Sequence, residues 1–281
     1  MDSTYSVSTR KRSIFSHLSV TSLIIFINII TFIIFTALIA LNVIPISAIA
    51  ITPMNILHGR DLWTFITSMF MHDGLAHLFF NMFSLFFIGT FLEKIIGRKR
   101  YFWFYMIAGI FAGAVFVLFS GLFGTTTLGA QLFGAPDVAG VGASGAIFGL
   151  LGVLAVLVPY AKVFLILGPL VAIILGFIIS PVLSSSLSTF IMFVLNIYIL
   201  ISIFAIFSFN PNVRKLSMPV EMPFWLLPII AIIPLIVLGL FFPLPIANTA
   251  HLGGLFAGLV YGAYLKNKYK RKTKYLSRYF K

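Results

Sequence analysis

The chain consists largely of long apolar stretches separated by short polar junctions. Each stretch has about the 20 residues that an α-helix needs to cross the hydrocarbon core of a bilayer. The stretches lie at residues 19–41, 76–96, 101–123, 143–160, 163–181, 187–208, 222–242 and 248–265. This pattern predicts an all-α polytopic membrane protein with about eight spans.

The composition agrees with this class and excludes a soluble domain. Of the 281 residues, 60% are hydrophobic and 9% are charged, whereas soluble domains are about half apolar and a quarter charged. So few polar side chains cannot cover the surface of a soluble protein. We expect one transmembrane domain over residues 19–265, preceded by a short segment, 1–18, and followed by a tail, 266–281.

The distribution of basic residues predicts the orientation. The net charge is +13, and all but Arg60 of the 19 Lys and Arg residues fall on alternate junctions. Because basic junctions are retained in the cytoplasm, both termini are predicted to be cytoplasmic and the number of spans to be even. The basic, aromatic tail 266–281 is suited to the lipid headgroup region, so the charge predicts contact with the bilayer and no nucleic-acid partner. The chain has no cysteine, which excludes disulfides, a thiol nucleophile and thiolate metal ligands.

Four polar residues occur at membrane depth, where an unpaired polar group is costly and therefore suggests function. They lie in the first turns of predicted helices that start on the non-cytoplasmic side, at similar depth: His77, Asn81, Ser144 and His251. His77 and Asn81 are four residues apart, so they share one helix face and can direct donors to a common point. The alternative for this pair is ordinary hydrogen bonding between helices.

Ser144 and His251 carry the candidate chemistry. Ser144 lies in a Gly-Ala-Ser-Gly segment before a helical run, where the N–H groups of a helix N-terminus would face an oxyanion. The alternative is that small residues around this serine only allow close packing. His251 precedes Gly254 and Gly258, which form a small-residue face for a partner helix. If that partner begins at Ser144, the imidazole could act as its base.

No third member of a triad is evident, so the sequence suggests a dyad. The carboxylates on this side of the membrane lie in outer loops: Asp61, Asp73 and Asp137. The three histidines His72, His77 and His251 offer a metal site by residue type alone. No acidic or cysteine ligand joins them, and we therefore predict neither a metal nor a cofactor.

Taken in order, these motifs resemble those of the rhomboid family of intramembrane serine proteases. They are W-x-x-x-T-x-x-F-x-H (Trp63 to His72), H-x-x-x-N-M (His77 to Met82), G-x-x-x-E-x-x-x-G (Gly89 to Gly97), G-x-S-G (Gly142 to Gly145) and A-H-x-x-G-x-x-x-G (Ala250 to Gly258). The resemblance covers residues 58 to 265, excluding about 168–218.

The resemblance implies a role for each candidate residue. Ser144 would be the nucleophile and His251 its general base. The oxyanion hole would be formed by His77, Asn81 and the backbone N–H of Ser144. Supporting positions would be Phe148, which packs against the catalytic imidazole, His72 in the first outer loop, and Gly142 in the serine motif. Glu93 matches a structural carboxylate, with an ordinary interfacial charge as the alternative.

The main departure from the family is an insertion. The family core has six spans, and residues 168–218 add an inserted hydrophobic hairpin before the span that matches the fifth. Two extra crossings preserve parity, so Ser144 and His251 would still meet at one depth. Alternatively, Gly168, Pro169 and Pro181 could shape a re-entrant hairpin.

The function implied by the resemblance is hydrolysis of a peptide bond in or near the transmembrane segment of a membrane-protein substrate. Substrate is expected to enter beside the span at 222–242, with loop 243–249 as a lid. The expected location is a prokaryotic cell membrane, and no oligomeric state is predicted. Two alternatives belong to other classes: a catalytically silent rhomboid-like protein that binds membrane clients, and a small-solute transporter. The transporter predicts two related halves with paired broken helices, and the sequence has no such symmetry.

Overall fold

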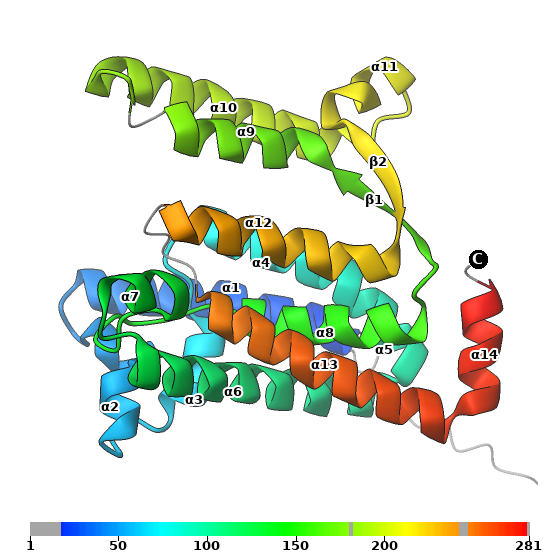
Figure 1. Ribbon diagram of the computed structural model, residues 1–281, viewed down its shortest axis with the longest axis horizontal. Helices are drawn as coiled ribbons and strands as arrows, with labels where there is room; N and C mark the ends of the chain where they lie inside the picture. Colours follow the sequence, from blue (N-terminus) through cyan, green and yellow to red (C-terminus); the bar gives the residue numbers. More distant parts are fainter. Residues whose placement is uncertain (1–17, 180–181, 242–246, 280–281) are drawn as a thin grey trace, which may run out of the picture.

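The computed structural model describes residues 18–179, 182–241 and 247–279, and these are mostly helical (Figure 1). The longer elements are α1 (Val20–Ala40), α4 (Leu75–Ser84), α5 (Thr90–Ile96), α6 (Arg98–Phe123), α8 (Ser144–Leu157), α9 (Leu167–Ile179), α10 (Ser185–Ala205), α12 (Leu227–Phe241) and α13 (Asn248–Lys268). A π-helical turn, Leu85–Gly89, joins α4 to α5. Each of the eight apolar stretches therefore contains helix.

Among the described residues, four helices are long and apolar enough to cross a bilayer: Val20–Ala40, Leu75–Ile96, Arg98–Phe123 and Ser185–Ala205. Shorter apolar helices cover Ser144–Leu157, Leu167–Gly176 and Phe224–Leu240. The all-α polytopic class is confirmed. The count of eight spans and the cytoplasmic position of both termini stay predictions, and so does the segment 1–18, of which residues 1–17 lie outside the described part.

The core is built around α8, which packs against α13 and α6. Leu150, Val153 and Leu154 of α8 are completely buried. The contact with α13 is unusually close, because a Cβ on Gly254 or Gly258 would collide with backbone of α8. Small residues that let two backbones approach are the usual means of helix packing in a membrane.

The connection between α1 and α4, predicted only as a polar loop, contains short helices that fold back on the bundle. These are α2 (Pro53–Leu57) and α3 (Thr64–Thr67), and a later loop contains α7 (Thr127–Phe133). The indole nitrogen of Trp63 donates to the Ala48 carbonyl at 2.9 Å, and the Thr67 hydroxyl donates to the Ile49 carbonyl at 2.8 Å. These bonds fix the loop that leads into α4.

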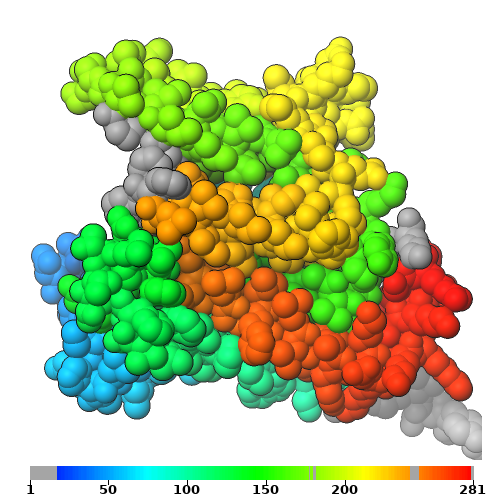
Figure 2. Space-filling view, in the orientation of Figure 1, coloured from blue at the N-terminus to red at the C-terminus, as the bar shows by residue number. Residues whose placement is uncertain are grey.

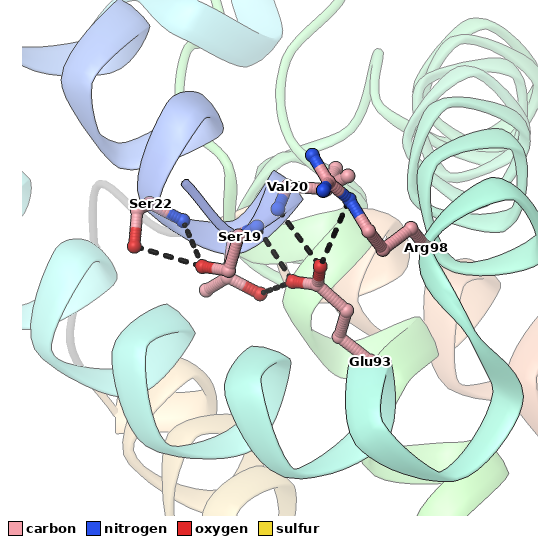
Figure 3. Close-up of polar contacts among 6 residues, drawn as sticks. Ser19, Val20, Ser22, Glu93 and Arg98 are labelled. Atoms are coloured by element: carbon pink, nitrogen blue, oxygen red, sulfur yellow. Dashed lines mark hydrogen bonds and ion pairs between the residues drawn. The ribbon is translucent and has the colours of Figure 1, made fainter. Parts of the chain in front are cut away.

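Glu93 is buried in α5, where its carboxylate caps the N-terminus of α1 (Figure 3). It accepts from the backbone N–H groups of Val20 and Thr21, each at 2.8 Å, and from the Thr21 hydroxyl at 2.7 Å. The Arg98 guanidinium lies 4.0 Å away. A carboxylate satisfies the free N–H groups of a helix N-terminus and complements its dipole. The contacts are those of a structural carboxylate that joins α1 to α5.

The inserted segment forms a helical hairpin on a two-stranded base. Strand β1 (Lys162–Ile166) pairs antiparallel with β2 (Pro219–Pro223), and the Lys162 ammonium lies 2.6 Å from the Glu221 carboxylate. The apolar stretch predicted as one helix over 163–181 thus begins as a strand. A run of β-branched and aromatic residues favours a strand when a partner satisfies its backbone groups. Beyond this base, α9 and α10 pack on each other, and a short helix, α11 (Pro211–Arg214), follows.

The hairpin lies along one edge of the bundle (Figures 1 and 2). It reaches the bundle through aromatic rings: Phe207 stacks on Phe87 with ring centroids 5.8 Å apart, and Phe204 lies 6.4 Å from Phe79. At the other end of the chain, the basic tail forms α14 (Lys270–Tyr279).

Candidate active site

Ser144 and His251 are joined by a hydrogen bond. Ser144 is the first residue of α8, and His251 lies in the first turn of α13. The Ser144 Oγ and the His251 Nε2 are 2.8 Å apart. The glycine contacts between α8 and α13 bring the two backbones close enough for side chains of this length to meet. This arrangement can transfer the hydroxyl proton to the imidazole.

The imidazole of His251 is oriented by stacking. It is buried, and the ring of Phe148 stacks on it with centroids 4.5 Å apart and an interplanar angle of 23°. Its second nitrogen, Nδ1, is buried and has no hydrogen-bond partner among the described residues. Among the described residues, the contact that restrains this ring on its second side is therefore the stacked Phe148 and not a carboxylate.

Gly142 provides the space in which His77 approaches Ser144. Its φ is +126°, a conformation that favours glycine. A Cβ built there would lie 2.9 Å from both Cε1 and Nε2 of His77. Its N–H donates to the Ser68 carbonyl at 2.8 Å, which anchors this turn to the first outer loop. The Nε2 edge of His77 therefore faces the turn that precedes Ser144.

Asn81 lies one turn after His77 on α4 and lines the same cavity. Its Nδ2 donates to the backbone carbonyl of His77 at 3.0 Å. A carboxamide nitrogen carries two hydrogens, so one remains for a ligand in the cavity. The backbone N–H of Ser144 begins α8, where N–H groups have no partner within the helix.

Asp73 is a neighbour of the site that the sequence analysis assigned to an outer loop without a role. Its Oδ1 lies 2.6 Å from Nδ1 of His77, and it lines the cavity. The four-residue spacing between Asp73 and His77 is the signal that could have indicated this pair. The carboxylate contacts His77 and not His251, and the Ser-His pair without a third member stays a prediction.

His72 is buried directly behind the site. Its side chain is 1% exposed, and neither ring nitrogen has a hydrogen-bond partner among the described residues. Burial lowers the pKa of His72 to about 3; the nearby His77 also lowers it, and Asp73 opposes this. The neutral ring meets that of His77 edge to face, with centroids 5.0 Å apart.

A cavity of about 490 Å³ is lined by Asp73, His77, Asn81, Ser144, Phe148 and His251, among others. Four helices and one turn contribute to its wall: α4 with Phe80 and Ser84, the π-helical turn after it with Ile88, α8 with Ile147 and Leu151, α12 with Leu227, Ala231 and Leu235, and α13 with His251. Within the described ranges, no three His, Asp or Glu side chains are grouped as metal ligands would be.

Fold and site together define a polytopic helical membrane protein in which a serine and a histidine meet in a cavity between helices. The sequence profile of the family described as "Rhomboid domain" matches residues 59–197 and 197–268. The chain belongs to the rhomboid family.

Individual relatives match over shorter segments. "RHOMBOID-like protein 1" of Arabidopsis thaliana is 39% identical over 97 residues, which are 34% of this chain and 21% of the relative. "Putative rhomboid protease YdcA" of Bacillus subtilis (strain 168) is 37% identical over 93 residues, or 33% of this chain and 40% of the relative. "Inactive RHOMBOID-like protein 8" of Arabidopsis thaliana is 36% identical over 76 residues, or 27% of this chain and 22% of the relative. The chain therefore spans a fifth to two fifths of these relatives' lengths.

Proposed function

We propose that this chain is an intramembrane serine protease that hydrolyses a peptide bond in or near the transmembrane segment of a membrane protein. The observation that carries the proposal is the 2.8 Å hydrogen bond between Ser144 Oγ and His251 Nε2 in the wall of the cavity. A serine hydroxyl is a poor nucleophile until a base takes its proton, and a neutral imidazole can do so near pH 7.

The proposed reaction has two stages. In the first, Ser144 Oγ attacks the substrate carbonyl carbon while His251 Nε2 accepts the hydroxyl proton. The C–N bond then breaks, and the same nitrogen gives this proton to the leaving amine. In the second stage, water gives a proton to His251 and attacks the ester carbonyl. The ester C–O bond then breaks, the new carboxyl terminus leaves, and His251 returns the proton to Ser144 Oγ.

The negative oxygen formed in each stage would be met by three donors. These are the His77 ring, the Asn81 carboxamide and the backbone N–H of Ser144. Removing one such donor from a soluble protease costs about 2.7–4 kcal/mol of transition-state stabilisation. All of these groups belong to the chain, so the proposed chemistry requires neither a metal nor a cofactor.

We further propose that substrate enters between α4 and α12, because both helices line the cavity. A helix in lipid satisfies its own backbone hydrogen bonds, so a transmembrane substrate must unwind locally before Ser144 can reach a carbonyl. Residues 243–246 of the lid predicted from the sequence lie outside the described residues, and the proposal rests on α12. The relatives come from a plant and a bacterium, so placement in a prokaryotic cell membrane stays a prediction.

A silent, client-binding protein is the second candidate, since one matched relative is named inactive. Reconstitution in proteoliposomes separates the two, with fluorescent reporters that each carry one transmembrane segment. We expect the wild type to cleave a reporter, and Ser144→Ala and His251→Ala to leave it intact. The controls Ser186→Ala and His58→Ala change exposed residues and should cleave normally. Cleavage by Ser144→Ala would contradict the proposal, whereas reporters that bind without cleavage would favour the silent protein.

A further inference from the structure

The carboxylate of Asp73 is bonded to the far side of His77, the ring whose other side faces Ser144. Asp73 Oδ1 lies 2.6 Å from Nδ1 of His77. The Nε2 edge of the same ring abuts Gly142, where an added Cβ would come within 2.9 Å of it. One imidazole thus connects an aspartate to the turn that carries the candidate nucleophile.

The positions of the protons on His77 follow from this contact. An ionised carboxylate only accepts hydrogen bonds, so a hydrogen on Nδ1 must lie between Asp73 and His77. If His77 carries no other proton, Nε2 is an acceptor and would repel a negative oxygen in the cavity. Nε2 can donate to that oxygen while Nδ1 is held by Asp73 only when the ring carries both protons and a positive charge.

No other group that contacts His77 or lines the cavity with it, among the described residues, supplies a second carboxylate to this ring. His72, from the loop before α4, is buried and edge-on to it, and burial keeps the pKa of His72 far below neutral. Ser144 of α8 and His251 of α13 are hydrogen-bonded to each other. Asn81, one turn further along α4, donates to the backbone carbonyl of His77. Asp73 is the one carboxylate among the described residues that line the cavity.

We propose that Asp73 is a positioning residue that holds His77 in its doubly protonated form, so that Nε2–H donates to the oxyanion formed at Ser144. This inference rests on the proposed protease function and adds a residue to it. A hydrogen bond from a charged donor is about twice as strong as one from a neutral donor. The positive ring would also balance the charge of the negative oxygen.

The proposal predicts a particular dependence on pH. Without Asp73, a neutral His77 is free to carry its proton on Nε2 and to act as an uncharged donor. The Asp73→Ala variant should therefore be slower than the wild type where the wild-type ring is charged. A wild-type ring with a single proton, held on Nδ1 by Asp73, has no donor at Nε2, so at alkaline pH, where imidazoles are neutral, Asp73→Ala should become the faster of the two.

The experiment measures the rate of labelling by a fluorophosphonate probe between about pH 6 and 9.5, which extends from the range in which imidazoles change charge to more alkaline solution. In this reaction Ser144 Oγ bonds to phosphorus, fluoride leaves, and His251 takes the hydroxyl proton. Every variant keeps Ser144 and His251, so the same nucleophile and the same base react in each. We expect the ratio of wild-type to variant rates for Asp73→Ala to be about tenfold near pH 7–8 and to fall below one at the alkaline end.

Two further variants make the test specific. Asp137→Ala removes a carboxylate from an exposed loop position and should label like the wild type at every pH. In a His77→Ala background, Asp73→Ala should have no additional effect, because the aspartate acts through the ring. Any of three results would overturn the proposal. The ratio could be one at every pH, or it could differ from one without changing with pH. Asp73→Ala could also lower the labelling rate as much in the His77→Ala background as in the wild type. Absence of Ser144-dependent labelling in the wild type would instead contradict the protease function.

Discussion

The Oγ of Ser144 lies 2.8 Å from Nε2 of His251, although 107 positions separate the two residues along the chain. The distance results from helix packing, because glycines on α8 and α13 let the two backbones approach closely. A polar pair at this depth is costly unless it is satisfied, and here each partner satisfies the other. The predictions below follow from this pair and from the groups that surround it.

Replacing Asn81 should slow the reaction without unfolding the protein. Asn81→Ala removes the carboxamide that lines the cavity one turn after His77. We expect turnover of a reporter substrate to fall by about a hundredfold or more, which is the typical effect of losing one oxyanion donor. Asn212→Ala is the matched control, because Asn212 is exposed in the inserted segment. Equal rates for the two variants would show that Asn81 gives no help to the transition state.

Alanine variants of Gly142 and Gly59 distinguish a steric clash with His77 from the cost of an unfavourable backbone conformation. Both glycines have positive φ, +126° and +72°, but a Cβ at Gly142 meets His77 whereas nothing lies within 4 Å of one at Gly59. Each alanine variant should lose roughly 1–2 kcal/mol of stability from the left-handed backbone. Only Gly142→Ala should also displace His77 and lower fluorophosphonate labelling by more than about tenfold. Labelling and thermal unfolding in detergent measure the two effects, and normal labelling of Gly142→Ala would contradict the described geometry.

His72 should make the folded state sensitive to acid. Burial lowers its pKa from 6.5 to about 3, so between these values the unfolded chain binds a proton that the folded chain does not. The stability attributable to neutral His72 is therefore complete above pH 6.5 and decreases as the pH falls, by about 1.4 kcal/mol per unit.

The measurement is the free energy of unfolding in detergent between pH 6.5 and 4. His72→Leu removes the titrating group and should flatten this decline. His58→Ala removes an exposed histidine and should leave the slope unchanged. Parallel curves for the wild type and His72→Leu would show that His72 does not contribute to the acid sensitivity.

Joining α4 to α12 should exclude a transmembrane substrate but not a small molecule. The chain contains no cysteine, so cysteines introduced at Phe80 and Leu235, which line the cavity from the two helices, would be the only thiols. We expect a bifunctional thiol reagent to stop cleavage of a transmembrane reporter, relative to the same variant before treatment. Labelling by a fluorophosphonate should continue. Continued reporter cleavage after complete cross-linking would exclude entry between these helices.

Much of the fold could be predicted from the sequence, because helix in a membrane is specified by local apolar length. The eight apolar stretches each contain helix, and the close packing at Gly254 follows from a small-residue pattern. The strand at Lys162–Ile166 could not be predicted in this way. Its partner lies beyond the inserted hairpin, at Pro219–Pro223, and only that long-range pairing distinguishes an apolar strand from the start of a helix.

Those parts of the candidate site that lie in motifs of recognisable spacing, such as His77 with Asn81, could be predicted from the sequence. Asp73 was missed because it precedes α4, and its four-residue spacing from His77 indicates a contact only if the loop turns in the same way as the helix that follows it. The stacked contact between Phe207 and Phe87 could not be predicted either, since the segments that carry the two rings are far apart in sequence. Tertiary contacts of this kind depend on where a connection turns, which local composition does not specify.

The most direct test of the account is fluorophosphonate labelling of the purified protein in detergent, followed by identification of the modified residue by mass spectrometry. The wild type should be labelled at Ser144, and Ser144→Ala and His251→Ala should not be labelled although both remain folded. An unlabelled but folded wild type, or equal labelling of His251→Ala, would contradict the claim that His251 activates Ser144 as a nucleophile.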